Sequence, residues 1–193
     1  MDTQDIRTLK ILEEMDQDEA PSQRHLATKL NVSLGLVNSF IKRLVKKGYF
    51  KVSTIPANRV RYILTPKGAA EKTRLTYEYV QQSFLVYRDT RRKLSKIFKR
   101  LENQEIKKVV FLGVSEIAEI AYISLQETAV ELVGIVDRAH AGEKFFGFKV
   151  FTPEEVSAVN FERMLVTGAE ATDSVINDIL DLGIAKNRIV LLQ

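Results

Sequence analysis

The segment Ser22–Phe50, SQRHLATKLNVSLGLVNSFIKRLVKKGYF, constrains the fold of this chain more than any other. Ser22 has a side chain suited to cap a helix, and apolar residues then recur at helical spacing up to Leu30. Asn31-Val32 interrupts this pattern, and Ser33 caps a second amphipathic stretch. Two short helices joined by so tight a turn predict a helix-turn-helix.

The second of these helices has two distinct faces. Val37, Ile41 and Leu44 form one apolar stripe, which we expect to be buried. Small and polar side chains on the other side would let the helix sit deep in the major groove of double-stranded DNA. The candidate DNA-reading residues are Ser33, Leu34, Gly35, Asn38, Ser39 and Lys42. The alternative is an ordinary solvated helical hairpin.

A β-hairpin follows the two helices. Gly48 ends the second helix, residues 49–53 and 59–64 alternate like strands, and residues 55–58 suit a turn. Arg59 and Arg61 share one face of the returning strand. On a winged helix this hairpin lies over the sugar-phosphate backbone, so these arginines would supply charge rather than base readout. Taken alone, they are equally consistent with a solvated strand edge.

Charge divides the chain into two unlike halves. Residues 1–104 contain 21 Lys and Arg against 11 Asp and Glu, a net charge of +10. Residues 105–193 contain 8 against 14, a net charge of −6. Because DNA attracts the first half and repels the second, we expect only the first to bind it.

Other features mainly exclude classes of protein. The chain has no cysteine, which rules out disulfides, zinc-finger ligation and thiol redox sensing. His25 and His140 stand far apart in the sequence, so we expect no metal site. We find no signal peptide and no apolar run near the roughly 20 residues that span a bilayer. These absences predict a cytoplasmic protein without a membrane partner.

A long helix is predicted from about Lys67 to Asn103. It carries a heptad stripe with one polar member, namely Tyr77, Val80, Phe84, Tyr87, Arg91, Leu94, Phe98 and Leu101. Something must cover this stripe. One interpretation is packing within the chain, on the N-terminal helix or on the second domain. The other is a homodimer, which would hold two DNA-reading helices about one turn of DNA apart.

The second half alternates strands and helices. Strands are expected at 108–112, 131–136, 149–151, 163–167 and 188–192, with helices at 115–128, 153–158 and 173–182. This alternation predicts a parallel sheet flanked by helices. The fold class is therefore two-domain α/β. We expect a winged helix-turn-helix at 1–70, a linker helix at 71–104, and a Rossmann-like domain at 105–193.

The first strand-to-helix turn of this second half is a weakened dinucleotide fingerprint. Gly113 keeps the first glycine, whereas Ser115 and Ala118 replace the second and third. The Ser115 hydroxyl could bond a phosphate or cap the helix. Asp137 ends the next strand, where an acidic residue can accept hydrogen bonds from a ribose.

The first half resembles MarR-type winged-helix regulators, especially those associated with exopolysaccharide gene clusters. The resemblance spans about Asp5 to Arg92 and rests on the helix-turn-helix, on NRVRYILTPKG at 58–68 and on EKTRLT at 71–76. It implies dimerisation through terminal helices. Many such proteins carry Asp-x-Arg in the wing, where this chain has Pro56 and Asn58.

The second half resembles the small Rossmann-like domain of sugar O-acyltransferases and nucleotide-sugar dehydratases. The matching segments are VVFLGVSEIAEIA, ELVGIVDR and GEKFFGFKVFTPEEV. The resemblance implies a pocket for a nucleotide or nucleotide sugar, and the glycine fingerprint adds a dinucleotide as a further candidate. The residues of this pocket would be Gly113, Ser115, Asp137, Thr167 and Gly168.

We expect no catalytic residue and no enzyme, because some 88 residues hold a nucleotide half-site but no second domain for a substrate. One functional hypothesis is a ligand-responsive transcriptional regulator of polysaccharide or nucleotide-sugar genes. The alternative is a constitutive regulator whose second half is a vestigial dimerisation or partner-recruiting scaffold.

Overall fold

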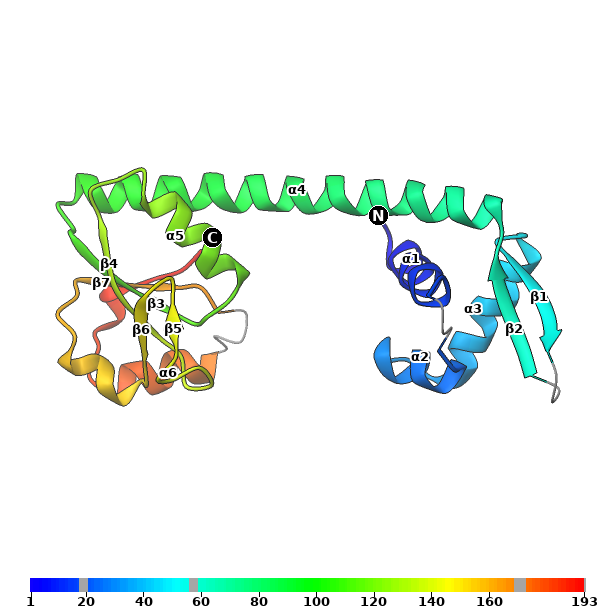
Figure 1. The fold of residues 1–193 in the computed structure, drawn as a ribbon. Coiled ribbons are helices and arrows are strands. Elements are labelled where there is room, and N and C mark those ends of the chain that lie inside the picture. The colour runs from blue at the N-terminus through cyan, green and yellow to red at the C-terminus, as the bar shows by residue number, and fades with distance from the viewer. Residues whose placement is uncertain (18–20, 56–58, 169–172, 193) are drawn as a thin grey trace. The chain divides into compact units, whose positions relative to one another are not determined.

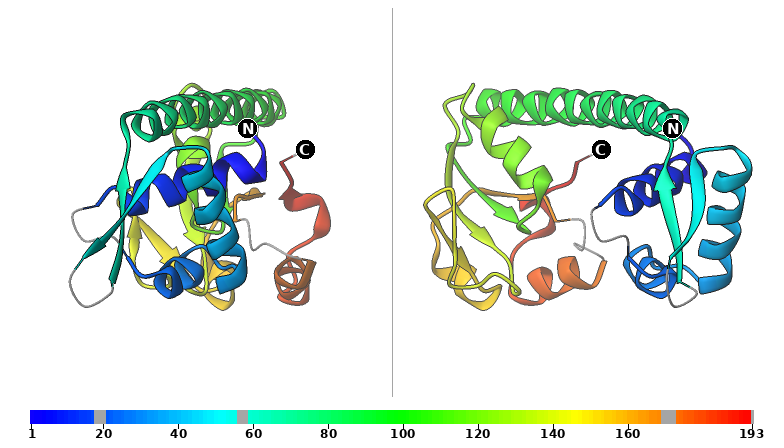
Figure 2. Two further views of the ribbon diagram at one scale, coloured as in Figure 1. Left: turned by 90° about the vertical axis from the view of Figure 1, so that its right-hand side faces the viewer. Right: turned by 45° about the vertical axis from the view of Figure 1, so that its right-hand side comes forward.

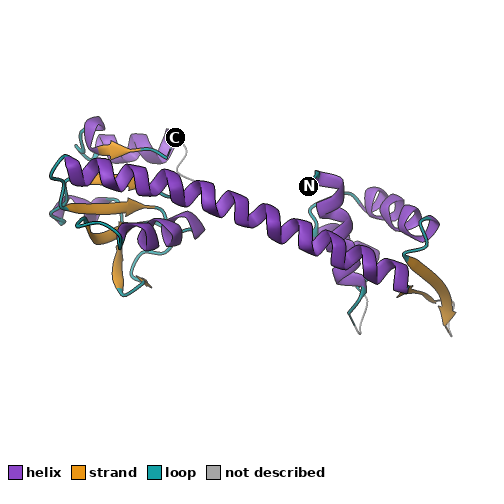
Figure 3. Ribbon diagram, turned by 90° about the horizontal axis from the view of Figure 1, so that it is seen from above, coloured by secondary structure: helices purple, strands orange, loops and turns teal. Residues whose placement is uncertain are grey.

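The computed structural model describes residues 1–17, 21–55, 59–168 and 173–192. It divides into two compact units, Met1–Leu85 and Val86–Gln193. The two-domain α/β class predicted from the sequence is confirmed. The long helix α4, Pro66–Asn103, is one uninterrupted helix whose two ends belong to different units (Figure 3).

The described residues of the first unit form three helices and a hairpin before α4. These are α1 (Thr3–Met15), α2 (Gln23–Lys29), α3 (Leu34–Lys46), β1 (Phe50–Ile55) and β2 (Arg59–Leu64), followed by the start of α4 (Figure 1). Ser22 and Ser33 accept hydrogen bonds from the first turns of α2 and α3, as expected of N-caps. Asn31, in the turn between these helices, has a φ of 50°. The predicted helix-turn-helix and hairpin are therefore confirmed.

The core of the first unit lies between α1, α2, α3 and the start of α4. Leu12 and Leu26 are fully buried, and Leu75 of α4 packs in the same cluster. Thr65 joins the hairpin to α4 because its hydroxyl accepts the Gly68 N–H at 3.0 Å and donates to the Gly48 carbonyl at 2.6 Å. A Cβ at position 68 would lie 2.2 Å from the Tyr49 carbonyl oxygen, so glycine is required there. This junction explains the Leu-Thr-x-x-Gly sequence at 64–68.

The second unit is built on a six-stranded sheet ordered β5-β6-β4-β3-β7-β8. The strands are β3 (Lys108–Leu112), β4 (Glu131–Val136), β5 (Lys144–Phe145), β6 (Phe148–Phe151), β7 (Arg163–Val166) and β8 (Ile189–Val190). All neighbours are parallel except β5 and β6, which form a hairpin. The sequence predicted the five parallel strands and missed β5.

Helices cover both faces of this sheet (Figure 2). The end of α4 and α5 (Glu116–Leu125) pack on one face through Leu94, Phe98 and Ala121. The 3-10 helix η1 (Glu154–Ala158) and α6 (Asp173–Asp181) cover the other through Val156 and Ile179. A second 3-10 turn, η2 (Lys186–Arg188), precedes β8. If the five parallel strands are numbered from one to five along the chain, their order in the sheet is 3-2-1-4-5. The order of the strands therefore reverses between β3 and β7.

The two ends of the predicted heptad stripe of α4 have different surroundings. Leu94, Phe98 and Leu101 are buried in the core of the second unit. Tyr77 and Phe84 are more than 60% exposed. For Leu94, Phe98 and Leu101, packing on the second domain is therefore the interpretation that the structure confirms, because the chain's own sheet covers them.

Candidate functional site

Helix α3 presents two faces of opposite character. Val37, Ile41 and Leu44 are buried as predicted, and Phe40 joins them. The other side carries the residues that the sequence assigned to DNA reading. Ser33, Leu34, Gly35, Ser39 and Lys42 are exposed, and Asn38 is half-buried. The structure thus brings all six together, with Ser33 as the N-cap and the other five on α3.

Sequence reasoning did not single out Arg43, in the last turn of α3. Its Nη1 donates to Gln4 Oε1 at 2.9 Å, and its guanidinium lies 4.5 Å from the centre of the Phe40 ring. The hydrogen bond to Gln4 attaches α3 to α1, whereas the contact with Phe40 lies within α3. Arg43 is therefore a structural cation, unlike the exposed Lys42 next to it.

The wing is an antiparallel hairpin in which Ser53 pairs with Arg61 and Ile55 with Arg59. Arg61 is exposed. The side chain of Arg59 and the turn with Pro56 and Asn58 lie outside the described residues. The wing is attached to α2 because Gln23 Nε2 donates to the Tyr62 hydroxyl at 3.3 Å.

A cavity of about 790 Å³ lies in the second unit, at the carboxyl ends of β3 and β4. Gly113, Ser115, Asp137 and Gly168 line it, so the structure brings together four of the five predicted pocket residues. The fifth, Thr167, is 1% exposed and lies behind the lining. Ligands of open α/β sheets bind at this position.

Gly113 shapes the first turn through close backbone contact. Its φ is +101°, and a Cβ there would lie 2.3 Å from the Gly168 Cα. The glycine therefore allows the ends of β3 and β7 to approach each other. A larger residue would meet Gly168 before it met any ligand.

Ser115 is the N-cap of α5. Its Oγ accepts from the N–H groups of Ile117 and Ala118 at 3.1 and 3.2 Å and donates to the Thr167 carbonyl at 2.7 Å. The hydroxyl proton of Ser115 is therefore already engaged in a hydrogen bond within the chain. Of the two roles that the sequence left open, capping is the one that this geometry satisfies.

Asp137 binds the same turn through its carboxylate. Oδ2 accepts the Val114 N–H at 2.8 Å, and Oδ1 accepts from Ala139 and His140 at 2.9 and 3.2 Å. Burial raises the pKa of Asp137, but the hydrogen bonds from Val114, His140 and Ala139 outweigh it, so the pKa lies below its ordinary value. This carboxylate therefore fixes the loop between β3 and α5.

The remaining charged groups at the cavity are mostly acidic. Glu116, Glu119 and Asp178 line it and are exposed. Arg138 also lines it, but its Nη2 lies 2.7 Å from Glu154 Oε1. Within residues 1–17, 21–55, 59–168 and 173–192 there is no group of three or more His, Asp or Glu side chains that could hold a metal ion. None of the described helices is long and apolar enough to cross a membrane.

Comparisons with known proteins recognise the two units separately. Residues 4–51 match the family model of winged helix-turn-helix DNA-binding domains. The first unit is a winged helix-turn-helix domain. Residues 105–190 match the model described as C2185-like, N-terminal. No curated protein sequence matches the chain significantly.

One matching solved structure is the zinc-dependent MarR family transcriptional regulator AdcR in its Zn(II)-bound state. The two chains are 24% identical, with a TM-score of 0.36. The match covers 47% of this chain and 61% of that one. This chain thus spans less than two thirds of the length of that regulator.

Proposed function

We propose that this protein is a MarR-type transcriptional regulator that binds double-stranded DNA through α3. The observation that carries the proposal is the face of α3 with Asn38, Ser39 and Lys42, opposite a buried stripe in a winged helix-turn-helix domain. Exposed polar side chains on such a helix can reach base edges in the major groove. The wing would contribute charge through Arg61.

This division of roles is tested with Asn38→Ala and Arg61→Ala. Loss of a base contact at Asn38 should relax sequence preference at one operator position, by about 1 to 3 kcal/mol. Loss of Arg61 should weaken binding to all sequences alike and lower the salt slope by about one unit. Lys10→Ala removes one exposed charge from α1 and serves as the control for net charge. Equal losses for Asn38→Ala on operator and random DNA would contradict the assignment.

We further propose that two copies associate through the exposed part of α4. Tyr77, Val80 and Phe84 lie at i, i+3 and i+7 and are 65, 42 and 62% exposed. Apolar side chains at this spacing form the seam of helix pairs. A homodimer would present two α3 helices to a palindromic operator.

The third part of the proposal is a small-molecule effector in the cavity of the second unit, such as a nucleotide, dinucleotide or nucleotide sugar. The position of the cavity, at the carboxyl ends of β3 and β4, supports this proposal. The regulated genes would then be those of polysaccharide or nucleotide-sugar metabolism. A thermal-shift screen tests it, because ligand at about 100 times its Kd stabilises by roughly 2.7 kcal/mol.

The second candidate is a constitutive regulator whose second unit is a vestigial scaffold. The hydrogen bonds of Ser115 and Asp137 favour it, since both side chains are occupied by the chain's own backbone. The carboxylates Glu116 and Glu119 would also repel a phosphate at the start of α5. A screen in which no nucleotide or nucleotide sugar raises the melting temperature would favour this candidate.

A further inference from the structure

The second unit is acidic except along one face of α4. Residues 86–104 contain seven Lys and Arg against two carboxylates, whereas residues 105–193 carry a net charge of −6. Four of the cations, Arg88, Arg92, Lys96 and Lys99, follow one another at i, i+4, i+8 and i+11. They therefore lie on one side of the helix. We call this set the basic stripe.

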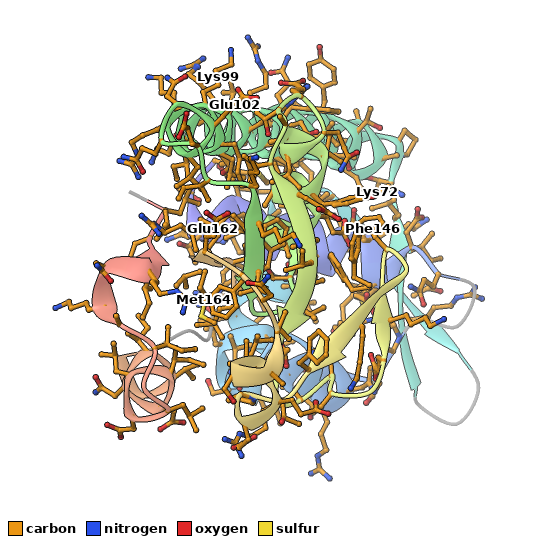
Figure 4. All side chains as sticks on the ribbon, turned by 90° about the vertical axis from the view of Figure 1, so that its left-hand side faces the viewer. Lys72, Lys99, Glu102, Phe146, Glu162 and Met164 are labelled. Carbon is orange, nitrogen blue, oxygen red and sulfur yellow. The ribbon has the colours of Figure 1, made fainter. Side chains whose placement is uncertain are left out.

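The basic stripe lies opposite the buried side of α4. Leu94, Phe98 and Leu101 pack on the sheet, and at 100° per residue the stripe is centred about half a turn away from them. All four cations are exposed. Figure 4 shows Lys99 on the side of α4 that points away from the sheet. The unit itself therefore cannot cover the stripe.

Few carboxylates neutralise these cations. Arg92 lies 3.9 Å from Asp89, and among the described residues Arg88, Lys96 and Lys99 form no ion pair. A shallow groove of about 500 Å³ runs along them. Its carboxylate, Glu127, is paired with Arg91.

The arrangement is unfavourable for an isolated helix. Arg88, Arg92 and Lys96 are like charges spaced four apart, and such pairs destabilise a helix. The start of the same helix has the opposite pattern, because Arg74 lies between Glu71 and Glu78 at 2.9 and 2.5 Å. A merely solvated face would be expected to alternate charges in that way. Bound anions would relieve the repulsion along the stripe.

We propose that the basic stripe is a second DNA-contacting surface, which binds the phosphate backbone without reading sequence. From Arg88 to Lys99 it extends about 17 Å, the length of roughly ten phosphate charges along a duplex. DNA is the polyanion that the winged helix would hold near the stripe at high local concentration. The inference therefore rests on the proposed function.

The test compares two triple variants of the full chain on a long duplex of random sequence. Arg92→Gln/Lys96→Gln/Lys99→Gln removes three stripe charges, and Gln retains the helix propensity of the residues that it replaces. Lys107→Gln/Lys144→Gln/Lys186→Gln removes three exposed charges elsewhere in the same unit. Circular dichroism melts confirm that both variants fold.

The stripe variant should lower the slope of log K against log salt by about 2.7, and the control should not. Between about 50 and 200 mM salt, the wild type would then lose about 40-fold more affinity than the stripe variant. An unchanged slope, or equal changes in both variants, overturns the inference while leaving DNA binding intact. A wild type that binds no DNA overturns the proposed function as well. If the stripe variant changes the sedimentation coefficient in the absence of DNA, the basic stripe contacts a second copy of the chain, and the inference fails.

Discussion

At the scale of single residues, the loop between β3 and α5 is stabilised by the same groups that bind ligands in related folds. The Asp137 carboxylate accepts a hydrogen bond from the Val114 N–H. The Ser115 hydroxyl connects α5 to the Thr167 carbonyl, and Gly113 packs on Gly168. The sequence located this turn correctly, because a glycine between a buried strand and a capped helix has few interpretations. It could not show that these polar groups satisfy one another, since their partners lie 23 and 52 residues away.

The close approach at Gly113 predicts a strong effect of the smallest substitution. Gly113→Ala should destabilise the second unit by about 2 to 4 kcal/mol, from the positive φ together with the contact on Gly168. Gly142→Ala is the matched control, because Gly142 also has a positive φ but nothing within 4 Å of the added Cβ. It should lose only about 1 to 2 kcal/mol. Urea denaturation followed by circular dichroism measures both, and equal losses would disprove the steric account.

Asp137 predicts a particular pH dependence of stability. Its pKa is lower in the folded chain than in the unfolded one, so the unfolded state binds more protons between the two values. The stabilisation is therefore complete above the unfolded pKa of about 3.9 and is lost as the pH falls through the folded pKa.

Asp137→Asn removes this contribution. The difference in free energy of unfolding between wild type and Asp137→Asn should be constant near neutral pH and shrink below about pH 4. Wild type must be compared with Asp137→Asn because Glu162 also makes the stability depend on pH. Hydrogen bonds from the Lys107 and Lys108 N–H groups lower the pKa of Glu162. Urea titrations at several pH values measure the difference. A difference that grows on acidification would refute the assignment.

At the scale of elements, α4 shows what a periodic sequence can and cannot reveal. The seven-residue repeat correctly predicted a helix that ends at Asn103, because no proline or glycine interrupts residues 69–103. The same repeat could not indicate what covers each part. Leu94 and Phe98 turned out to belong to the chain's own core, whereas Tyr77 and Phe84 are exposed. Apolar residues at helical spacing look the same in both cases.

The exposed part of α4 yields a prediction about self-association. Phe84→Glu should leave the fold intact, because the side chain is 62% exposed, but should place a charge in the proposed seam and yield monomers. Gln82→Glu introduces the same charge at an exposed position on the opposite side of the helix and should leave the dimer intact. Analytical ultracentrifugation distinguishes these outcomes. A folded Phe84→Glu protein that remains dimeric would place the interface elsewhere.

At the scale of the whole molecule, the two units differ in charge and in the partners that suit them. The winged helix carries an exposed polar helix face, whereas the second unit carries a cavity bordered by carboxylates. Each class of fold followed from the sequence, because a helix-turn-helix and a strand-helix alternation have strong local patterns. Coupling between the units has no such pattern, since it depends on the difference in free energy between conformations of the chain.

If an effector regulates DNA binding, the coupling must be reciprocal. A ligand that changes DNA affinity tenfold has its own affinity changed tenfold by DNA, a coupling of about 1.4 kcal/mol. We therefore predict that calorimetric titration of a stabilising nucleotide or nucleotide sugar gives different Kd values with and without saturating operator. The ratio should equal the ratio of operator affinities with and without that ligand. Ligand binding with the same Kd in both titrations would show that the cavity is occupied but uncoupled, and the constitutive regulator would then be the better description.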